Sequence, residues 1–275
     1  MLPSFIAIGP GKSGTTWLYE CLKEHPQICL AYHIKETMFF DRYYYKGIEW
    51  YERFFCHCKY TSVIGEISNT YFFSPDVPAR MKRIIPDIKL ITCLRNPIDR
   101  IYSLYLFRVR NGFIRVPFEE AIRDDPSMVT DNFYFDHLSN YLRYFDRNQM
   151  YIGIYDDLKE NPHKFIQEIY KFLGVDISFI PSRLYERILP ASAPRNKILF
   201  RLAKRCALIA RDMGMFSILG WAKQSKVLYK ILLRPYTDKD YPKIRQETRT
   251  YLYSVFQDQL VQLSELIGRD LSHWQ

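Results

Sequence analysis

The 275-residue chain lacks any long apolar run. A helix that spans a bilayer needs ~18 or more consecutive apolar residues, and no uninterrupted segment reaches that length, so we expect no transmembrane helix. The N-terminus also lacks a basic stretch followed by a long apolar core, because Met1 to Phe5 runs directly into a strand-like segment. Without a secretory signal or a membrane span, a cytoplasmic protein is expected.

Cysteine is scarce and scattered. The six cysteines lie between Cys21 and Cys206 without the dense spacing of a disulfide scaffold. Cys56 and Cys58 flank His57 and form the one tight pair, but the sequence has no second pair at zinc-ligand spacing. We therefore expect reduced, structural thiols and no metal site.

Acidic residues are almost absent from one segment. Between Arg195 and Pro235, ten lysines and arginines stand against a single acid, Asp212, and this excess equals the net charge of +9. The remaining 234 residues hold 29 basic and 29 acidic side chains. This balance excludes a generally basic protein that coats nucleic acid, so no nucleic-acid partner is expected. A composition of 48% hydrophobic and 25% charged residues also excludes a disordered chain.

Short apolar runs alternate with helical patterns along the first two thirds of the chain. Strands are expected at Phe5–Ile8, Val63–Glu66, Lys89–Leu94 and Gln149–Tyr155. Helices are expected at Gly14–Glu24, Asp76–Ile85, Ile98–Asn111, Phe118–Arg123, Asp131–Asp146 and Pro162–Leu173. Strands separated by helices predict an α/β fold, in which a parallel sheet is covered by helices on both faces.

The last part of the chain has a different pattern. From Asn196 onward it is only helical, and it ends with a helix expected over Arg245–Ile267. Residues 181–194 have the composition of a connecting loop. We predict a single domain over residues 1–275, with an α/β nucleotide-binding core at 1–180 and a helical C-terminal extension at 195–275.

A glycine-rich turn follows the first expected strand and opens the first expected helix. It reads Gly9-Pro10-Gly11-Lys12-Ser13-Gly14-Thr15-Thr16. Small residues let successive backbone N–H groups point at an anion, and the helix N-terminus adds partial positive charge. Lys12 adds a full charge, and the serine and threonines add hydroxyl donors. The pattern predicts a phosphate site rather than a plain strand-to-helix turn.

This turn differs from the Walker A loop of nucleoside triphosphatases. A Walker A loop needs a glycine five residues before its second glycine, and that position here is Ile6, inside the expected strand. No acidic strand suited to magnesium accompanies the turn. A P-loop-type nucleotide kinase stays an alternative function although the missing glycine argues against it, and an inactive nucleotide-binding interaction protein is another.

The run from Lys12 to Leu18, KSGTTWL, resembles the 5′-phosphosulfate loop of sulfotransferases that use 3′-phosphoadenylyl sulfate (PAPS), most closely the cytosolic branch. The run from Leu94 to Ser103 resembles the 3′-phosphate motif of the same family, in which an Arg at a strand end precedes a Ser by eight residues. Arg95 offers planar charged donors and Ser103 one hydroxyl, which suit a phosphate dianion. Gly268–Trp274 resembles the end of bacterial members.

The resemblance implies a P-loop-like fold, PAPS as cofactor and no metal. It implies in-line transfer of the sulfuryl group to a hydroxyl acceptor, a glycan or another alcohol. Cofactor contacts are expected from Gly11, Lys12, Ser13, Gly14, Thr15, Thr16, Trp17, Arg95 and Ser103. Lys12 is also expected to be catalytic, because its cation can stabilise charge on the leaving oxygen.

The general base is sought in the segment after the first helix. The Thr-His-Leu-Pro-like segment that carries the base of the cytosolic branch is absent, but Glu36-Thr-Met-Phe-Phe-Asp41 resembles the Glu-x-x-Phe-Phe-Asp segment of the heparan-sulfate-type branch. Glu36 is therefore the expected base, and Asp41 is expected to orient a neighbour or the acceptor. The alternative is that Glu36 is an exposed ion-pair partner of Lys35 or Lys23. The chain departs from this branch at Ile67, where a second catalytic lysine is expected.

The basic segment has three possible roles. Its cations lie on helical faces opposite apolar ones, with Arg201, Lys204 and Arg205 on the first helix and Lys223, Lys226 and Lys230 on the second. These faces are either solvated, a rim that attracts PAPS or an anionic glycan, or a surface for peripheral membrane contact through residues 198–233.

Overall fold

The computed structural model describes residues 1–32, 34–59, 63–186, 192–213, 215, 222, 225–235 and 244–274. Over these residues the chain forms two compact units. The first comprises Met1–Pro97, Phe133–Ile188 and Phe256–Gln275, and the second comprises Ile98–Asn132 and Leu189–Val255. Each unit is described by itself.

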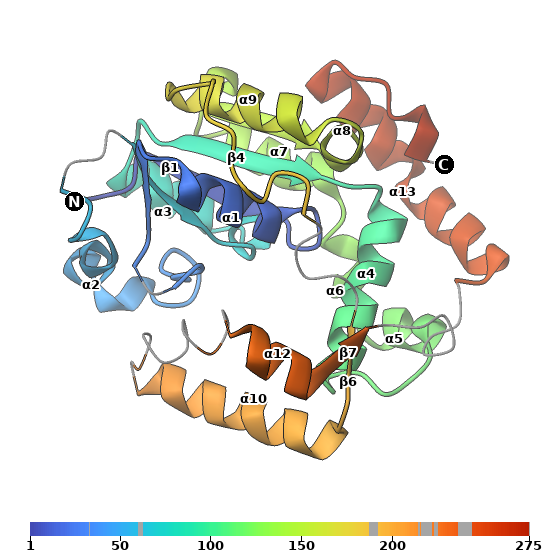
Figure 1. Ribbon diagram of the computed structural model, residues 1–275. Helices are drawn as coiled ribbons and strands as arrows, with labels where there is room; N and C mark the ends of the chain where they lie inside the picture. The colour runs from blue at the N-terminus through green and yellow to red at the C-terminus, as the bar shows by residue number, and fades with distance from the viewer. Residues whose placement is uncertain are drawn as a thin grey trace. The chain divides into compact units, whose positions relative to one another are not determined.

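The first unit is built on a five-stranded sheet with the order β2-β3-β1-β4-β5. Figure 1 labels β1 and β4 of this sheet. Its strands are β1 (Phe5–Gly9), β2 (Ile28–Leu30), β3 (Val63–Ile67), β4 (Lys89–Leu94) and β5 (Met150–Ile154). All four neighbouring pairs are parallel, so the carboxyl ends of the strands meet at one edge. The α/β prediction is confirmed, and so are four of the strands. β2 was not predicted because three residues are too few to show a periodic pattern.

Helices flank the sheet. The first unit contains α1 (Thr15–Glu24), α2 (Ile48–Glu52), α3 (Val77–Ile84), α7 (Tyr134–Leu142), α8 (Tyr155–Glu160) and α9 (Pro162–Leu173). Short 3₁₀ turns follow at η1 (Tyr44–Lys46), η2 (Arg53–Phe55), η3 (Tyr71–Phe73), η4 (Arg147–Gln149) and η6 (Ser272–Trp274). The main apolar core lies between the sheet, α1 and α9, and it includes Ala7, Leu18, Ile91 and Ile166.

The bounds of α9 follow from its sequence. The Asn161 side chain accepts a hydrogen bond from the Lys164 backbone N–H, and Pro162 occupies the first turn, where no N–H is needed. Gly174 ends the helix in the left-handed region, at φ 78°. Apolar side chains spaced three and four residues apart bury one face, and each stabilises the fold by roughly 1.5–3 kcal/mol. This face holds α9 over the sheet.

The second unit contains α4 (Pro97–Arg110), α5 (Phe118–Asp124), α6 (Ser127–Thr130), α10 (Lys197–Asp212) and α12 (Lys226–Leu232). It also contains a two-stranded antiparallel sheet of β6 (Ser192–Pro194) and β7 (Leu233–Pro235). The expectation of a purely helical pattern after Asn196 is therefore wrong at β7. Each strand has three residues, and their pairing joins segments about forty residues apart, so local periodicity carries no signal of it.

The helix α13 (Gln246–Ile267) was predicted to within one residue. Its residues up to Val255 belong to the second unit, and those from Phe256 onward belong to the first. No described helix combines the length and the apolar composition needed to cross a bilayer.

The expectation for the cysteines is wrong at two positions. Cys29 and Cys58 form a disulfide, while Cys21 and Cys93 are buried thiols and Cys56 is an exposed one. The two bonded cysteines are 29 residues apart in sequence. Cys29 lies opposite Ile64 in the β2–β3 ladder, and Cys58 precedes β3 by five residues, so strand pairing rather than local spacing brings them together.

Candidate active site

The glycine-rich turn leaves β1 at the carboxyl edge of the sheet. Gly9 has φ +109°, and a Cβ there would lie 2.6 Å from the Asn69 carbonyl oxygen. Gly14 has φ +84°, and a Cβ there would lie 2.6 Å from Leu158 Cδ2. Both positions favour glycine because side chains rarely adopt such φ values, and at Gly9 a Cβ would also collide with fixed backbone. Lys12 also has a positive φ, at 74°.

The turn gathers donors with few protein acceptors. Ser13 is fully buried, and among the described residues none forms a hydrogen bond with its Oγ. α1 begins at Thr15, so the first-turn N–H groups, including those of Thr16 and Trp17, have no acceptor within the helix. A buried hydroxyl without a partner costs about 1–3 kcal/mol, and an anion bound in the turn would remove that cost.

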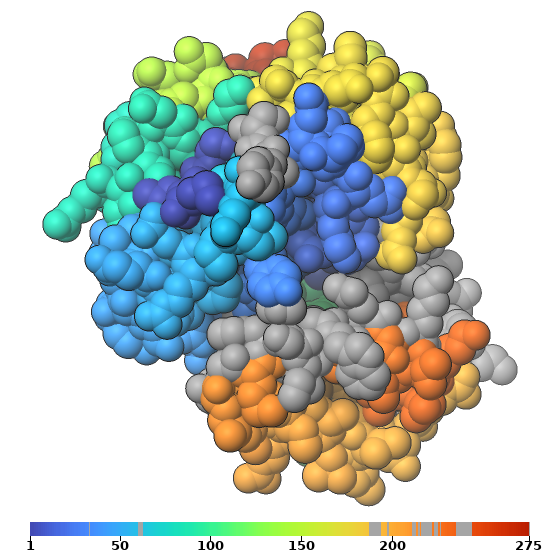
Figure 2. Space-filling model, turned by 60° about the vertical axis from the view of Figure 1, so that its left-hand side comes forward, coloured from blue at the N-terminus to red at the C-terminus, as the bar shows by residue number. Residues whose placement is uncertain are grey.

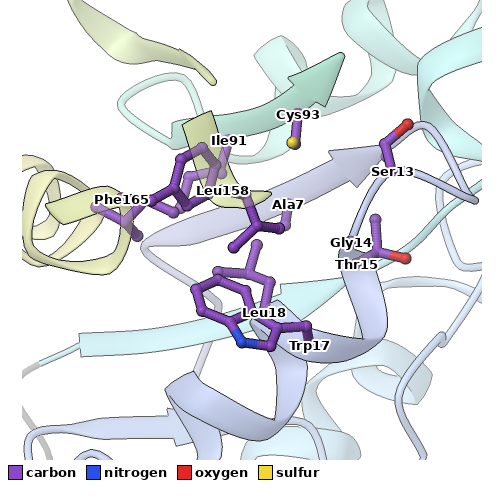
Figure 3. A pocket seen from close by; sticks show the side chains of 12 residues that line it. Ala7, Ser13, Gly14, Thr15, Trp17, Leu18, Ile91, Cys93, Leu158 and Phe165 are labelled. Carbon is purple, nitrogen blue, oxygen red and sulfur yellow. The ribbon is translucent and has the colours of Figure 1, made fainter. Parts of the chain in front are cut away.

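The Trp17 side chain points away from this anion position. Its indole Nε1 donates a hydrogen bond of 2.9 Å to the Leu184 carbonyl, and its ring packs edge-on against Phe165. Figure 3 shows Trp17 and Phe165 on the apolar side of a small cavity behind the turn, with Ser13 and Thr15 on the side of the loop. The cavity belongs to the core, and Trp17 can contact a cofactor in the turn only through its backbone.

Arg95 follows β4 and lies beside the turn. Its Nη1 donates a hydrogen bond of 3.2 Å to the Lys12 carbonyl, and its guanidinium carbon lies 5.0 Å from the centroid of the Tyr155 ring. The Arg95 carbonyl accepts a hydrogen bond of 2.9 Å from the Tyr134 hydroxyl. The structure therefore brings Arg95 and the turn together. Ser103 lies on α4 in the second unit and is half-buried, and its role as a cofactor contact stays a prediction.

Glu36 lies within a polar cluster that extends to the turn. Its Oε1 accepts a hydrogen bond of 2.5 Å from Asn69 Nδ2 and lies 3.5 Å from Lys35 Nζ. Lys35 Nζ in turn donates to Thr15 Oγ1 at 3.4 Å. The ion pair with Lys35 exists, but the side chains are only 16% and 24% exposed, so it is not the open surface pair of the alternative interpretation.

The segment that carries Glu36 is held by a buried carboxylate, Glu66, at the end of β3. Glu66 accepts hydrogen bonds from the Thr37 N–H at 2.9 Å, the Thr37 hydroxyl at 2.6 Å and the Tyr51 hydroxyl at 2.6 Å. Burial raises the pKa of Glu66 to about 6, although the hydrogen bonds from Thr37 and Tyr51 oppose the rise. These bonds position the backbone next to Glu36.

Asp41 ties the other end of this segment to the same strand end. Its Oδ2 accepts a hydrogen bond of 2.5 Å from the Thr70 hydroxyl, and Arg80 Nη1 donates a hydrogen bond of 2.8 Å to the Phe40 carbonyl. Asp41 thus orients a neighbour, one of the two roles expected for it. The backbone between these anchors turns at Met38, which has φ 55°.

Sequence reasoning did not find the roles of Lys35, Asn69 and Glu66. Lys35 directly precedes the expected base, Glu66 lies in β3 and Asn69 follows that strand by two residues. What the sequence could not supply is the distance between them. The cluster contains two carboxylates: Glu66 is buried and engaged by Thr37 and Tyr51, while Glu36 is partly exposed and can accept a proton beside cations and N–H groups.

Comparisons with known proteins match the chain to one protein family. The family model described as "Sulfotransferase domain" matches residues 2–194. Over an alignment of 297 residues the chain is 32% identical to bifunctional heparan sulfate N-deacetylase/N-sulfotransferase 4 of Mus musculus. It is 30% identical, over the same alignment length, to bifunctional heparan sulfate N-deacetylase/N-sulfotransferase 3 of Homo sapiens. Each alignment covers 99% of this chain and 31% of the relative, so the chain spans about a third of the length of these relatives.

Solved structures agree on the fold. A sulfotransferase from Alicyclobacillus acidocaldarius superposes with a TM-score of 0.73 at 22% identity, covering 100% of this chain and 99% of the other. The sulfotransferase domain from the curacin biosynthetic pathway superposes with a TM-score of 0.51 at 16% identity, covering 67% and 78%.

Proposed function

This chain belongs to the sulfotransferase domain family, and from that premise we propose that it transfers the sulfuryl group of PAPS to a hydroxyl or amine acceptor. The observation that carries the proposal is the buried Ser13 hydroxyl, which has no hydrogen-bond partner among the described residues and lies in a turn where Gly9 and Gly14 adopt positive φ values. This geometry favours a phosphate or sulfate group close to the backbone. When bound, PAPS supplies the sulfuryl group and leaves as 3′-phosphoadenosine 5′-phosphate (PAP).

Residues of the turn fit the 5′ end of such a nucleotide. Gly11, Lys12, Ser13, Gly14, Thr15, Thr16 and the backbone of Trp17 would hold the 5′-phosphosulfate, and Arg95 with Ser103 would hold the 3′-phosphate. These groups are cations, hydroxyls and N–H donors, which suit an anion. The motif resemblance implies a reaction without a metal.

Three side chains divide the chemistry. Glu36 would accept the proton of the attacking hydroxyl or amine, which strengthens the nucleophile. Lys12 would stabilise negative charge on the leaving oxygen. Lys35, which contacts both Glu36 and Thr15, would contact the transferred group and so compensate for Ile67, where the related branch has a lysine.

The acceptor is proposed to be a glycan. The relatives named as heparan sulfate N-sulfotransferases support an amino sugar, while the hydroxyl of a glycan or another alcohol is the acceptor that the motif resemblance implies. Labelled PAPS offered to one glycan in free-amine and N-acetylated forms separates the two. Label confined to the free-amine form indicates N-sulfation, and equal labelling of both indicates O-sulfation.

A binding and turnover experiment tests the proposal. We expect Lys12→Ala and Arg95→Ala each to weaken PAP binding at least about tenfold in calorimetry, because each removes a charged donor worth about 1.5–3 kcal/mol. The exposed Lys23 and Arg83 supply the matched controls Lys23→Ala and Arg83→Ala, which should bind normally. Unchanged binding in the Lys12 and Arg95 variants would contradict the site.

The experiment also separates the alternatives. Binding of PAP without sulfate transfer to any acceptor would favour an inactive interaction protein, and magnesium-dependent consumption of ATP would favour a kinase. The kinase is the weaker candidate, because Ile6, at the position where Walker A needs glycine, is fully buried within β1.

We also propose that α10 contacts an anionic membrane surface. Its inner face is Phe200, Ala203, Ala207 and Ala210, which are buried or half-buried. A second face exposes apolar side chains, including Ile198 at 66%, Leu202 at 56% and Ile209 at 51%. Arg201, Lys204 and Arg205 are exposed beside it. Figure 2 shows α10 in light orange at the surface.

This arrangement is typical of helices that lie in a lipid interface, with apolar side chains toward the acyl chains and cations toward the headgroups. The predicted membrane surface extended over residues 198–233 and included three lysines on a second helix. Lys230 is exposed on α12, whereas Lys223 and the side chain of Lys226 lie outside what the structure describes.

A further inference from the structure

Cys29, His57 and Cys58 form a cluster of soft ligand atoms that the proposed reaction does not use. His57 Nε2 lies 3.2 Å from Cys29 Sγ and 3.6 Å from Cys58 Sγ. The three ligand atoms all lie within 4.8 Å of one another. Two sulfurs and one imidazole nitrogen are the donors that Zn²⁺ prefers in proteins.

The fold holds these side chains together by means other than the disulfide. Cys29 is the central residue of β2, which pairs with β3. The Tyr32 N–H donates a hydrogen bond of 2.8 Å to the Phe54 carbonyl, and the centroid of the Tyr32 ring lies 4.8 Å from that of the His57 ring. The Cys58 N–H donates a hydrogen bond of 3.0 Å to the Phe55 carbonyl. Because these contacts are independent of the disulfide, we expect the cluster to persist when the bond is reduced.

We propose that, with the disulfide reduced, Cys29 Sγ, Cys58 Sγ and His57 Nε2 bind one Zn²⁺, with a water molecule as fourth ligand. Zn–S bonds of about 2.3 Å and Zn–N bonds of about 2.0 Å at tetrahedral angles place sulfur and nitrogen about 3.5 Å apart. The two distances from His57 Nε2 already lie near that value. Only the two sulfurs must separate, to about 3.7 Å by the same geometry.

The chemistry balances with a dithiol as reductant. The dithiol passes two electrons and two protons to the S–S bond, which breaks into two thiols, and the reductant becomes a cyclic disulfide. Zinc binding then releases both thiol protons to solvent, and neutral His57 donates its Nε2 lone pair. Two thiolates neutralise the charge of the metal. Cys58 is buried, and a neutral site is compatible with that burial.

Either form closes the segment that carries Glu36. Glu36 lies between Cys29 and Cys58 in sequence, and the disulfide links the two ends of that segment. The metal would link the same two ends where the surroundings keep thiols reduced. Figure 2 looks onto this part of the chain, which appears as the light-blue surface. His57 is exposed, so an ion has access from solvent.

The test measures zinc bound by the full chain in two redox states. The chain is reduced with dithiothreitol, freed of reductant without oxygen, equilibrated with Zn²⁺ and dialysed, and its zinc is measured with a metallochromic dye. We expect one zinc per reduced chain and none per oxidised chain. Co²⁺ in place of Zn²⁺ should produce sulfur-to-cobalt charge-transfer absorption in the reduced chain alone.

Substitutions identify the ligands. Cys29→Ser, Cys58→Ser and His57→Ala should each reduce the bound zinc from one equivalent to nearly none. Cys56→Ser and Cys206→Ser alter the exposed thiols that the proposal leaves out, and both should retain one equivalent.

A reduced wild-type chain that binds no zinc would overturn the proposal, and so would full binding by His57→Ala. The comparison of oxidised with reduced wild type needs no substitution, and it therefore remains decisive if a variant fails to fold.

Discussion

The phosphate turn after β1 and the helix α10 both contain cations, but they use them in opposite ways. In the turn, Ser13 is fully buried and Arg95 donates a hydrogen bond to the Lys12 carbonyl. The turn therefore uses a small number of groups held close together. In α10, Arg201, Lys204 and Arg205 are exposed beside exposed apolar side chains. The helix belongs to the segment that accounts for the whole net charge, yet the anion site of the proposed chemistry lies in the balanced remainder.

This difference teaches that the amount of charge does not locate an anion site. A buried hydroxyl or N–H acts at short range in a low dielectric, whereas an exposed cation is screened by water and salt within about 10 Å. This contrast supports the proposals of one specific anion for the turn and an extended anionic surface for α10. Substitutions can separate the two roles.

The largest effect is expected from Glu36→Gln. Loss of the base should lower kcat about 10²- to 10⁴-fold, because the acceptor proton then has no carboxylate to receive it. PAP affinity should stay within twofold, since Glu36 is not a proposed cofactor contact. Sulfate transfer and calorimetry measure the two quantities, with the exposed Glu160→Gln as control. Full turnover by Glu36→Gln would remove this residue from the chemistry.

The next effect concerns α10. Arg201→Glu with Arg205→Glu should lower partitioning onto phosphatidylserine vesicles roughly 30-fold or more, because each cation near an anionic surface contributes about 1 kcal/mol. Co-sedimentation measures partitioning, and phosphatidylcholine vesicles show the part that does not depend on charge.

Arg123→Glu, at an exposed position on α5, is the matched control and should partition normally. PAP binding should be unchanged in every one of these variants. If the double variant partitions like the wild type, the cations of α10 are only solvated.

Glu66→Gln tests the support behind Glu36. The pKa of Glu66 in the folded chain is about 6, above its ordinary value of 4.5, so the folded state binds the proton more tightly than the unfolded state. The contribution of Glu66 to the free energy of unfolding is therefore full below pH 4.5. It is lost as the pH rises through 6, which lowers that free energy by about 2 kcal/mol. Glu66→Gln should lack that pH dependence.

Urea unfolding between pH 4.5 and 7 measures the difference between wild type and Glu66→Gln. The same measurement on Glu160→Gln provides the baseline for an exposed carboxylate. Parallel pH profiles for wild type and Glu66→Gln would contradict the raised pKa.

The smallest effect, and the sharpest for the comparison, is expected from Ser13→Ala. Loss of one hydroxyl should weaken PAP binding roughly 3- to 10-fold. The free energy of unfolding without ligand should stay the same or rise, because a buried hydroxyl without a partner is removed. Weaker binding together with lower stability would show that Ser13 has a structural role instead.

Several features of the fold and the site were predictable because they are local. Apolar runs marked β1, β3, β4 and β5, and helical periodicity marked α1, α9 and α13 nearly to the residue. The turn was readable because glycines, Lys12 and hydroxyls must occur in a fixed order to form it. Glu36 was predicted through its motif, and its role as the base stays a prediction.

Other features were not predictable, because each depends on segments far apart in sequence. β2, the β6–β7 pair and the Cys29–Cys58 disulfide all form across long separations. The contacts of Glu36 with Asn69 and of Glu66 with Thr37 likewise cross about thirty residues. Nothing in the local pattern around any one of these residues specifies its partner.

The sequence by itself determined the turn where we propose that an anion binds, because small residues and a helix start define that geometry within a few residues. Only the tertiary structure decided which side chains surround the turn. The parallel strands place the ends of β1, β3 and β4 at one edge, and this juxtaposition brings Asn69, Glu66 and Arg95 to the turn and to Glu36. The physical reason is that a turn is a matter of local backbone conformation, whereas a cluster of partners depends on how the whole sheet pairs.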